Sequence, residues 1–227
     1  VDYTTDHVLD ILFGLEGQND WFGGTNWSLS VHHNRYQTND VGTGYALLQP
    51  LQGLIDNGTF NPFETNPNNP AFLSAVGLVS TTIVKDAQSR LFEGDGQINF
   101  NLFQMPAGPA AFAAGFDYRD ESYHSLVDAQ SAAHNVLGTA GGNSSGERAE
   151  YAVFAELNLP IISTLNIDLA GRLDHYNDFG SSFNPKVSFE FRPVESLLLR
   201  ANYGTGFRAP SLSELHRAPA QTFTSAV

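Results

Sequence analysis

Two acidic residues lie two positions apart in a segment of alternating residues, and carboxylates in pairs can perform acid–base catalysis. They are Glu93 and Asp95. In an extended strand, residues i and i+2 point to the same face, so the two side chains would be neighbours. A solvated or arginine-paired wall uses the same residue types and is the commoner interpretation. No triad or dyad accompanies them, so the sequence predicts no enzyme and no catalytic residues.

Two glycine motifs also suggest chemistry. Residues 204–209 read G-x-G-x-x-A, the form of a phosphate-binding loop, and residues 142–146 read G-x-S-x-G, the form of a nucleophile elbow. A nucleotide loop needs a following helix in a βαβ unit, but Pro210 follows here. The second motif lies in a stretch rich in Ser and Gly. We interpret both as loop or turn sequence.

Seven histidines raise the question of a metal site. His32 and His33 are adjacent in an expected strand, so they point to opposite faces and cannot chelate together. The chain has no Cys, which removes thiolate ligands and disulfides. We therefore expect neither a metal nor a cofactor. The remaining histidines are divided between the apolar face of expected strands (His7 and His175, with His33) and expected loops (His124, His134 and His216).

Composition narrows the class of protein further. Of 227 residues, 41% are hydrophobic, enough for a large buried or lipid-facing surface. A formal charge of −13 argues against a nucleic-acid partner, because phosphate binding needs clustered positive charge. No apolar run reaches the roughly 18 residues of a membrane helix. The start at Val1, without a signal sequence, suggests a piece of a longer precursor.

The elements that would position these residues show a two-residue alternation of apolar and polar side chains. It is clearest in residues 147–216, where Leu165, Ile167 and Leu169 alternate with Asn166 and Asp168. Such a pattern is typical of strands with one apolar face. It predicts eight strands, at residues 7–15, 27–34, 92–102, 112–119, 150–159, 165–175, 186–192 and 197–203.

The connections between these strands alternate in length. Short ones are expected at 18–24, 105–109, 159–164 and 193–196, and longer ones at 37–88, with helical turns near 70–79, at 122–146 and at 176–185. In an antiparallel meander, alternate connections lie at the same end. Short turns at one end and long loops at the other are typical of outer-membrane barrels.

A soluble sandwich also alternates apolar and polar residues, but its strands usually have about 5 to 6 residues. The strands predicted here are longer, up to 11 residues within the alternating ranges, which is enough to cross a bilayer at a tilt. Aromatic residues near strand ends match the girdles of membrane barrels. The predicted fold class is therefore all-β, an antiparallel up-and-down meander of about eight long strands in a transmembrane barrel. The aromatic residues are Trp21, Phe22, Trp27, Tyr118, Tyr123, Tyr151, Tyr176 and Phe207.

The run Tyr203 to Leu215, YGTGFRAPSLSEL, resembles a barrel segment of TonB-dependent outer-membrane receptors. Residues 103–109, 113–119 and 61–63 are similar to the same family. The resemblance implies a complete protein with an N-terminal plug, a TonB box and a barrel of 22 strands. Residues 1–227 would then be a partial barrel domain, without the plug or the barrel's C-terminus. Alone, it should form an open curved sheet with its Leu/Phe/Val face convex and the edges of its outer strands unpaired.

The resemblance implies a function in TonB-energised uptake of a scarce ligand, such as a siderophore, a vitamin or an oligosaccharide, at the outer membrane of a Gram-negative bacterium. Its partners would be the TonB complex, through the plug, the small-molecule ligand, and outer-membrane lipid and lipopolysaccharide. Alternatives are a passive porin-like barrel, a soluble carbohydrate-binding module and, less favoured, a barrel enzyme. Ligand contacts are expected within Tyr36 to Asp86 and Ser122 to Glu147, with no single residue assigned. Residues Gly204 to Pro210 are interpreted as the extracellular end of a lipid-facing strand.

Overall fold

Eight antiparallel strands form one sheet in the order of the sequence, each bonded to the next. This computed structural model describes residues 2–21, 24–138 and 141–218, so the predicted turn residues Phe22 and Gly23 lie outside the described part. The predicted all-β meander is confirmed. The strands are β1 (Asp2–Asn19), β2 (Thr25–Ala46), β3 (Ser80–Met105), β4 (Gly108–Val127), β5 (Ser144–Ile162), β6 (Leu165–Tyr176), β7 (Gly180–Val194) and β8 (Leu197–Gly204).

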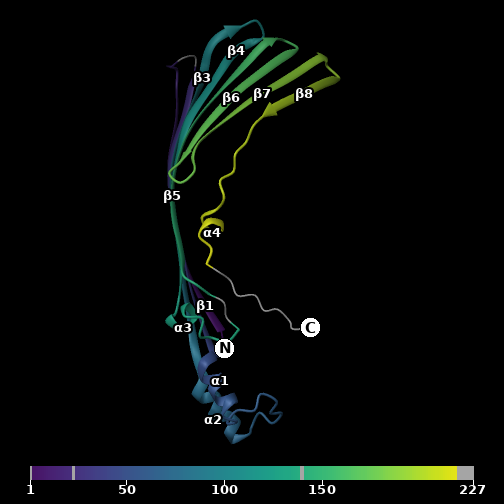
Figure 1. Ribbon diagram of the computed structural model, residues 1–227. Coiled ribbons are helices and arrows are strands. Elements are labelled where there is room, and N and C mark those ends of the chain that lie inside the picture. Colours follow the sequence, from purple (N-terminus) through teal and green to yellow (C-terminus); the bar gives the residue numbers. More distant parts are fainter. Residues whose placement is uncertain (1, 22–23, 139–140, 219–227) are drawn as a thin grey trace.

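The sheet is curved and open (Figure 1). β1 pairs with β2 and β8 pairs with β7, and neither outer edge has a partner within the described chain. The segment after β8 runs back along the concave side (Figure 1). The expectation of an open curved sheet is thus confirmed.

The two faces of the sheet differ in chemistry, as the alternation predicts. Arg148 on β5 donates a hydrogen bond to the carbonyl of Pro210, which lies in the segment on the concave side. The face of β5 that carries Arg148, Glu150 and Glu156 is therefore the concave face. Tyr151 and Val153 therefore lie on the convex face, where both are more than half exposed. Leu169, Leu173 and Phe189 remain between 43% and 44% exposed, because no second layer covers them. An apolar face this large needs lipid or another protein surface against it.

The first five strands are longer than predicted, and the two long connections are correspondingly shorter. β3 has 26 residues and β2 has 22, whereas about ten tilted residues cross a bilayer. From Phe92 to Leu102 on β3, about 3.4 Å per residue at a tilt of about 45° gives a rise of about 24 Å, close to the ~25 Å apolar band of such barrels. The additional length has polar residues on both faces, so the apolar alternation ends before the strand does. This is why the predicted loops at 37–88 and 122–146 began too early and ended too late.

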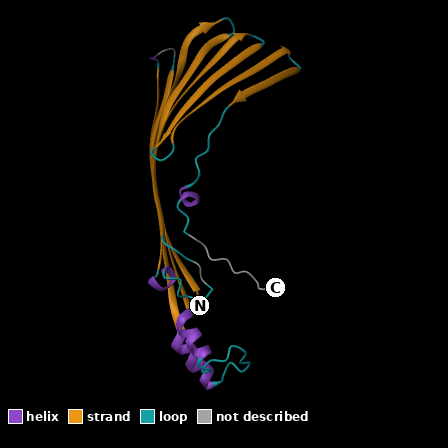
Figure 2. Ribbon diagram, in the orientation of Figure 1, coloured by secondary structure: helices purple, strands orange, loops and turns teal. Residues whose placement is uncertain are grey.

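The helices of the two long connections, α1, α2 and α3, lie at one end of the sheet (Figure 2). Between β2 and β3 come α1 (Leu48–Asp56) and α2 (Pro70–Val79), and between β4 and β5 comes α3 (Ala129–Ala132). α2 confirms the predicted helical turns; Asn69 caps it by accepting from the Ala71 amide, and Pro70 occupies its first turn. None of the described helices is long and apolar enough to cross a membrane.

One predicted connection is wrong. Residues 176–185 were expected to form a longer loop, but β6 ends at Tyr176 and β7 begins at Gly180. Pairing of His175 with Ser181 and of Arg172 with Asn184 carries the ladder through the Ser- and Asn-rich stretch. Gly180 has a positive φ of 79°, a conformation that glycine adopts readily, and this allows the tight turn. The alternation of short and long connections therefore ends after β5.

Candidate functional site: the concave face and its loop end

A chain of ionic contacts crosses the concave face from β1 to β4. His32 on β2 has one ring nitrogen 3.1 Å from Asp10 and the other 3.1 Å from Glu93. Arg119 on β4 donates to the other oxygen of Glu93 at 2.7 Å. Four neighbouring strands are therefore linked by side chains as well as by their backbones.

The chain of contacts continues across β5 and β6. Glu150 lies 3.9 Å from both Arg119 and Arg172, so one carboxylate bridges two guanidinium groups. Arg172 also donates to Asp174 at 2.6 Å and to Asp117. We call this set, from Asp10 to Asp174, the concave ladder.

The concave ladder rules out the acid–base pair considered from the sequence. Glu93 is held by His32 and Arg119, whereas Asp95 accepts a hydrogen bond from Ser30. The two carboxylates thus have separate partners, and neither is poised as a general acid or base beside the other. A hydrated, charged surface of this kind suits the inner wall of a barrel.

The two long connections, expected to carry ligand contacts, join each other beyond the end of the ladder. The Leu48 amide donates to the Asn135 carbonyl at 2.6 Å, and the Leu137 amide donates to the Ala46 carbonyl at 2.8 Å. Leu47 and Val136 form an isolated antiparallel bridge. Parts of both predicted regions, Tyr36 to Asp86 and Ser122 to Glu147, are therefore neighbours at one end of the molecule (Figure 1).

A polar cavity of about 600 Å³ lies at this end on the concave side. Two carboxylates, Asp2 and Asp40, and two cations, Lys85 and Arg217, line it together with hydroxyl groups. Thr4 donates to Asp40 at 2.6 Å, which fixes that carboxylate. The hydroxyl-bearing lining residues are Tyr3, Thr4, Tyr45, Ser125, Ser131 and Ser144.

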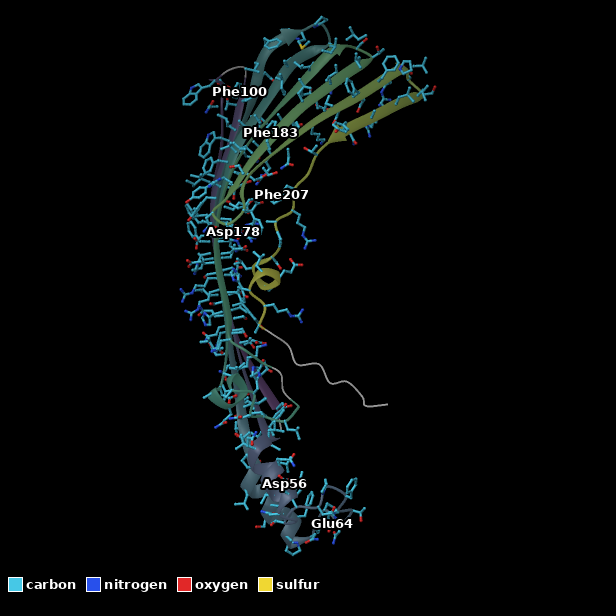
Figure 3. All side chains as sticks on the ribbon, in the orientation of Figure 1. Asp56, Glu64, Phe100, Asp178, Phe183 and Phe207 are labelled. Atoms are coloured by element: carbon cyan, nitrogen blue, oxygen red, sulfur yellow. The ribbon has the colours of Figure 1, made fainter. Side chains whose placement is uncertain are left out.

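Arg148 holds the segment after β8 against the concave face. Its side chain is 5% exposed and donates a forked pair of bonds to Asp178, at 2.8 and 2.9 Å, and one to the Pro210 carbonyl at 2.9 Å. Its guanidinium carbon lies 5.2 Å from the Phe179 ring centroid, a cation–π distance. In Figure 3, Asp178 and Phe207 mark the two segments that it joins. No sequence pattern signals this role of Arg148, because its partners lie 30 and 62 positions away.

The glycine motif at 204–209 leads into this segment. β8 ends at Gly204, and the Thr205 amide still donates to the Pro185 carbonyl. The expectation that Gly204 to Pro210 form the end of a lipid-facing strand is therefore wrong; the chain leaves the wall after Gly204, and Pro210 lies on the concave side. The helix that follows, α4 (Leu212–Leu215), has only four residues. Its N-terminus is already satisfied by a capping box between Ser211 and Glu214, so it offers no phosphate cradle.

The second glycine motif, 142–146, forms the entry to β5 and no strand-to-helix elbow. Its Gly146 lies under His216, and an added Cβ would approach the ring at 2.6 Å. The motif therefore provides close packing for the segment after β8.

The histidines are spread over the molecule. His124, expected in a loop, lies within β4, 3.5 Å from Asp86. His134 lies in the connection after α3, and His216 follows α4. Within residues 2–21, 24–138 and 141–218, no group of three or more His, Asp or Glu side chains could hold a metal ion.

The curved meander, the convex apolar band and the polar inner face define a section of a transmembrane barrel wall. Residues 2–225 match the family model "TonB dependent receptor-like, beta-barrel". The chain belongs to this family. It is therefore a section of an outer-membrane receptor barrel and not of an enzyme.

Distant relatives agree with the assignment. The chain is 21% identical over 218 residues to the iron-regulated outer membrane virulence protein of Vibrio cholerae serotype O1, covering 92% of this chain and 29% of that protein. A variant of the ferric enterobactin receptor PfeA from Pseudomonas aeruginosa has a TM-score of 0.56 at 18% identity, covering 93% of this chain and 27% of the other. The RagAB peptide transporter also has a TM-score of 0.56, at 12% identity, covering 89% of this chain and 23% of the other. The two structures establish the fold, and the chain spans less than a third of each relative.

Proposed function

We propose that this chain forms part of the wall and ligand entrance of a receptor that imports a scarce iron chelate of the siderophore class with energy from TonB. The observation that carries the proposal is the polar cavity on the concave face, which is lined by the ends of the first five strands, the connection between β4 and β5 and the segment after β8. Two of the relatives carry iron in their names, the iron-regulated virulence protein and the ferric enterobactin receptor, which supports this ligand class over a vitamin or an oligosaccharide.

The cavity lining suits a chelate with oxygen donors. The cations Lys85 and Arg217 can bind anionic oxygens, and hydroxyl groups such as Tyr45 can donate to neutral ones. Because Asp2 and Asp40 lie in the same cavity, its cationic groups do not act alone, so charge and hydrogen bonding together would select the ligand.

The test uses the complete receptor in iron-starved cells. TonB-energised uptake predicts accumulation of radioactive iron from a ferric siderophore, and loss of that accumulation in cells without TonB. Equal uptake with and without TonB would instead indicate the porin-like alternative. A panel of ferric catecholates, ferric hydroxamates, vitamin B12 and oligosaccharides identifies the ligand class; saturable uptake of a non-iron ligand alone would overturn the iron proposal.

The cavity itself is tested with Lys85→Gln. Loss of a charge-assisted hydrogen bond of about 1.5–3 kcal/mol predicts roughly a tenfold or larger rise in the Kd of the ferric chelate at the cell surface. The matched control is Lys186→Gln, the same substitution on β7 within the barrel wall. Equal affinities in the two variants would contradict a role for this cavity.

A further inference from the structure

We infer that Arg35 and Arg90 form a binding site on the outside of the barrel for the phosphate groups of lipopolysaccharide. The two residues are direct Cα partners on neighbouring strands, Arg35 on β2 and Arg90 on β3. They lie on the convex face, because each is two positions from a residue of that face, His33 and Phe92 respectively. This inference goes beyond the proposed uptake function and depends only on the chain's place in the outer membrane.

Facing arginines need an anion. Like charges directly opposite each other in antiparallel strands are destabilising. Arg35 donates only to the neutral Gln37 side chain, at 3.2 Å, and Arg90 is exposed. Neither arginine forms an ion pair within the part of the chain that the structure describes. The next residues in the same row are Leu9 on one side and Ser122 on the other. The nearest convex carboxylate, Asp120 opposite Phe92, lies diagonally from Arg90 and forms no ion pair with it in the described structure.

The height of the pair on the wall matches a lipid headgroup. A row of rings crosses the convex face just below it: Phe92 contacts Tyr118 at 6.1 Å, and Tyr118 contacts Tyr151 at 5.0 Å between centroids. Such aromatic rows lie at the membrane–water interface. Both arginines are one outward-facing position beyond this row, on the side of the long connections, which is the cell exterior.

The chemistry favours a lipid phosphate over a free anion. A guanidinium group binds phosphate through two parallel N–H donors, and two groups side by side can hold one phosphate from both sides. The chain has a formal charge of −13, so a mobile anion in solution is repelled by the molecule as a whole. A phosphate on a lipid that packs against the apolar band below is held beside the pair by its acyl chains, whose burial offsets that repulsion.

The test measures lipopolysaccharide retained by the complete receptor after extraction and purification in detergent. We expect the double variant Arg35→Gln/Arg90→Gln to retain on the order of tenfold less lipid than the parent. Arg35→Lys/Arg90→Lys keeps the charge but loses the forked geometry, and its retention should lie between the two. Arg192→Gln, at the end of β7 near the short turns, is the control with the same chemical change and should retain as much lipid as the parent.

Two further arms identify the source of the phosphate. Lipid A carrying its phosphates should rebind to the delipidated parent receptor, and dephosphorylated lipid A should bind no better than it does to the double glutamine variant. Unchanged retention in that variant, with heat-modifiable migration intact, would overturn the inference. Binding of inorganic phosphate as tight as that of phosphorylated lipid A would also overturn it, since the pair would then be a site for a soluble anion.

Discussion

At the scale of single residues, Arg148 joins parts of the molecule that are far apart in the sequence. Its buried guanidinium group contacts the β6–β7 turn through Asp178 and the segment after β8 through Pro210. A buried cation is tolerated only when its donors are satisfied, and here a carboxylate, a carbonyl and an aromatic face satisfy them. Arg148 is therefore the charged anchor of a segment that also packs against the sheet through His216 on Gly146 and Phe207 on Tyr176.

We expect Arg148→Met to release this segment, because the carboxylate of Asp178 and the carbonyl of Pro210 lose a charged donor. A loss of about 1.5–3 kcal/mol predicts roughly tenfold or faster trypsin cleavage after Arg208 and Arg217 in the complete receptor. Arg200→Met is the control: Arg200 is 70% exposed and pairs only with Glu190, a contact of little energetic value. Equal cleavage in the two variants would show that Arg148 does not hold the segment.

At the scale of elements, one aspartate organises the connection between β4 and β5. Asp128 caps α3 by accepting from the amides of Gln130 and Ser131, and it also accepts from the Val84 amide at the start of β3. Burial pushes its pKa upward, but these bonds and the Ser131 hydroxyl outweigh burial and hold the pKa of Asp128 below its usual range. The cap thus attaches one long connection to the strand that follows the other.

The lowered pKa of Asp128 predicts that the stability of the folded connection depends on pH. A carboxyl whose folded pKa is depressed stabilises the fold at pH above its unfolded pKa, near 3.8, and that stabilisation is lost as the pH falls through the lower folded pKa. Amide hydrogen exchange at 129–132, corrected for intrinsic rates, should therefore be protected at pH 7 and lose protection as acid protonates Asp128. Asp128→Ala should lack this protection at both values of pH. Protection in the parent that is the same at pH 7 and at about pH 3 would contradict the account.

The sequence predicted the elements where lipid imposes a pattern and failed where it does not. All eight strands, their order and the apolar face follow from the alternation, and the helical turns expected near 70–79 correspond to α2. Beyond Phe92 on β3 and His33 on β2, both faces are polar, so strand continuation depends on pairing with neighbours that are distant in sequence. For the same reason, the sequence pattern did not predict α1 or the short β6–β7 turn. The two expected contact regions contain Lys85 but not Arg217, because these two residues come to line one cavity only through the fold.

At the scale of the whole molecule, the chain is a curved wall with two chemically distinct faces. The concave ladder faces what would be the inside of a barrel, and the convex face exposes apolar residues over a height close to that of a bilayer core. The free edges of β1 and β8 can pair with further strands, which is how a barrel would close and satisfy its backbone in lipid.

Spin labels measure directly whether one face of the wall meets lipid and the other meets water. Because the chain has no Cys, single cysteines can be placed at successive positions 168 to 173 of β6 and spin-labelled in the complete receptor, freed of any other cysteine, in bilayers. Labels at the convex positions Leu169 and Leu173 should be relaxed by oxygen, which dissolves in lipid. Labels at the concave positions Asp168 and Arg172 should be shielded from lipid and less accessible to oxygen. Equal access of a water-soluble nickel reagent to all of these positions would contradict this assignment of the two faces. Higher oxygen accessibility at Asp168 and Arg172 than at Leu169 and Leu173 would also contradict it.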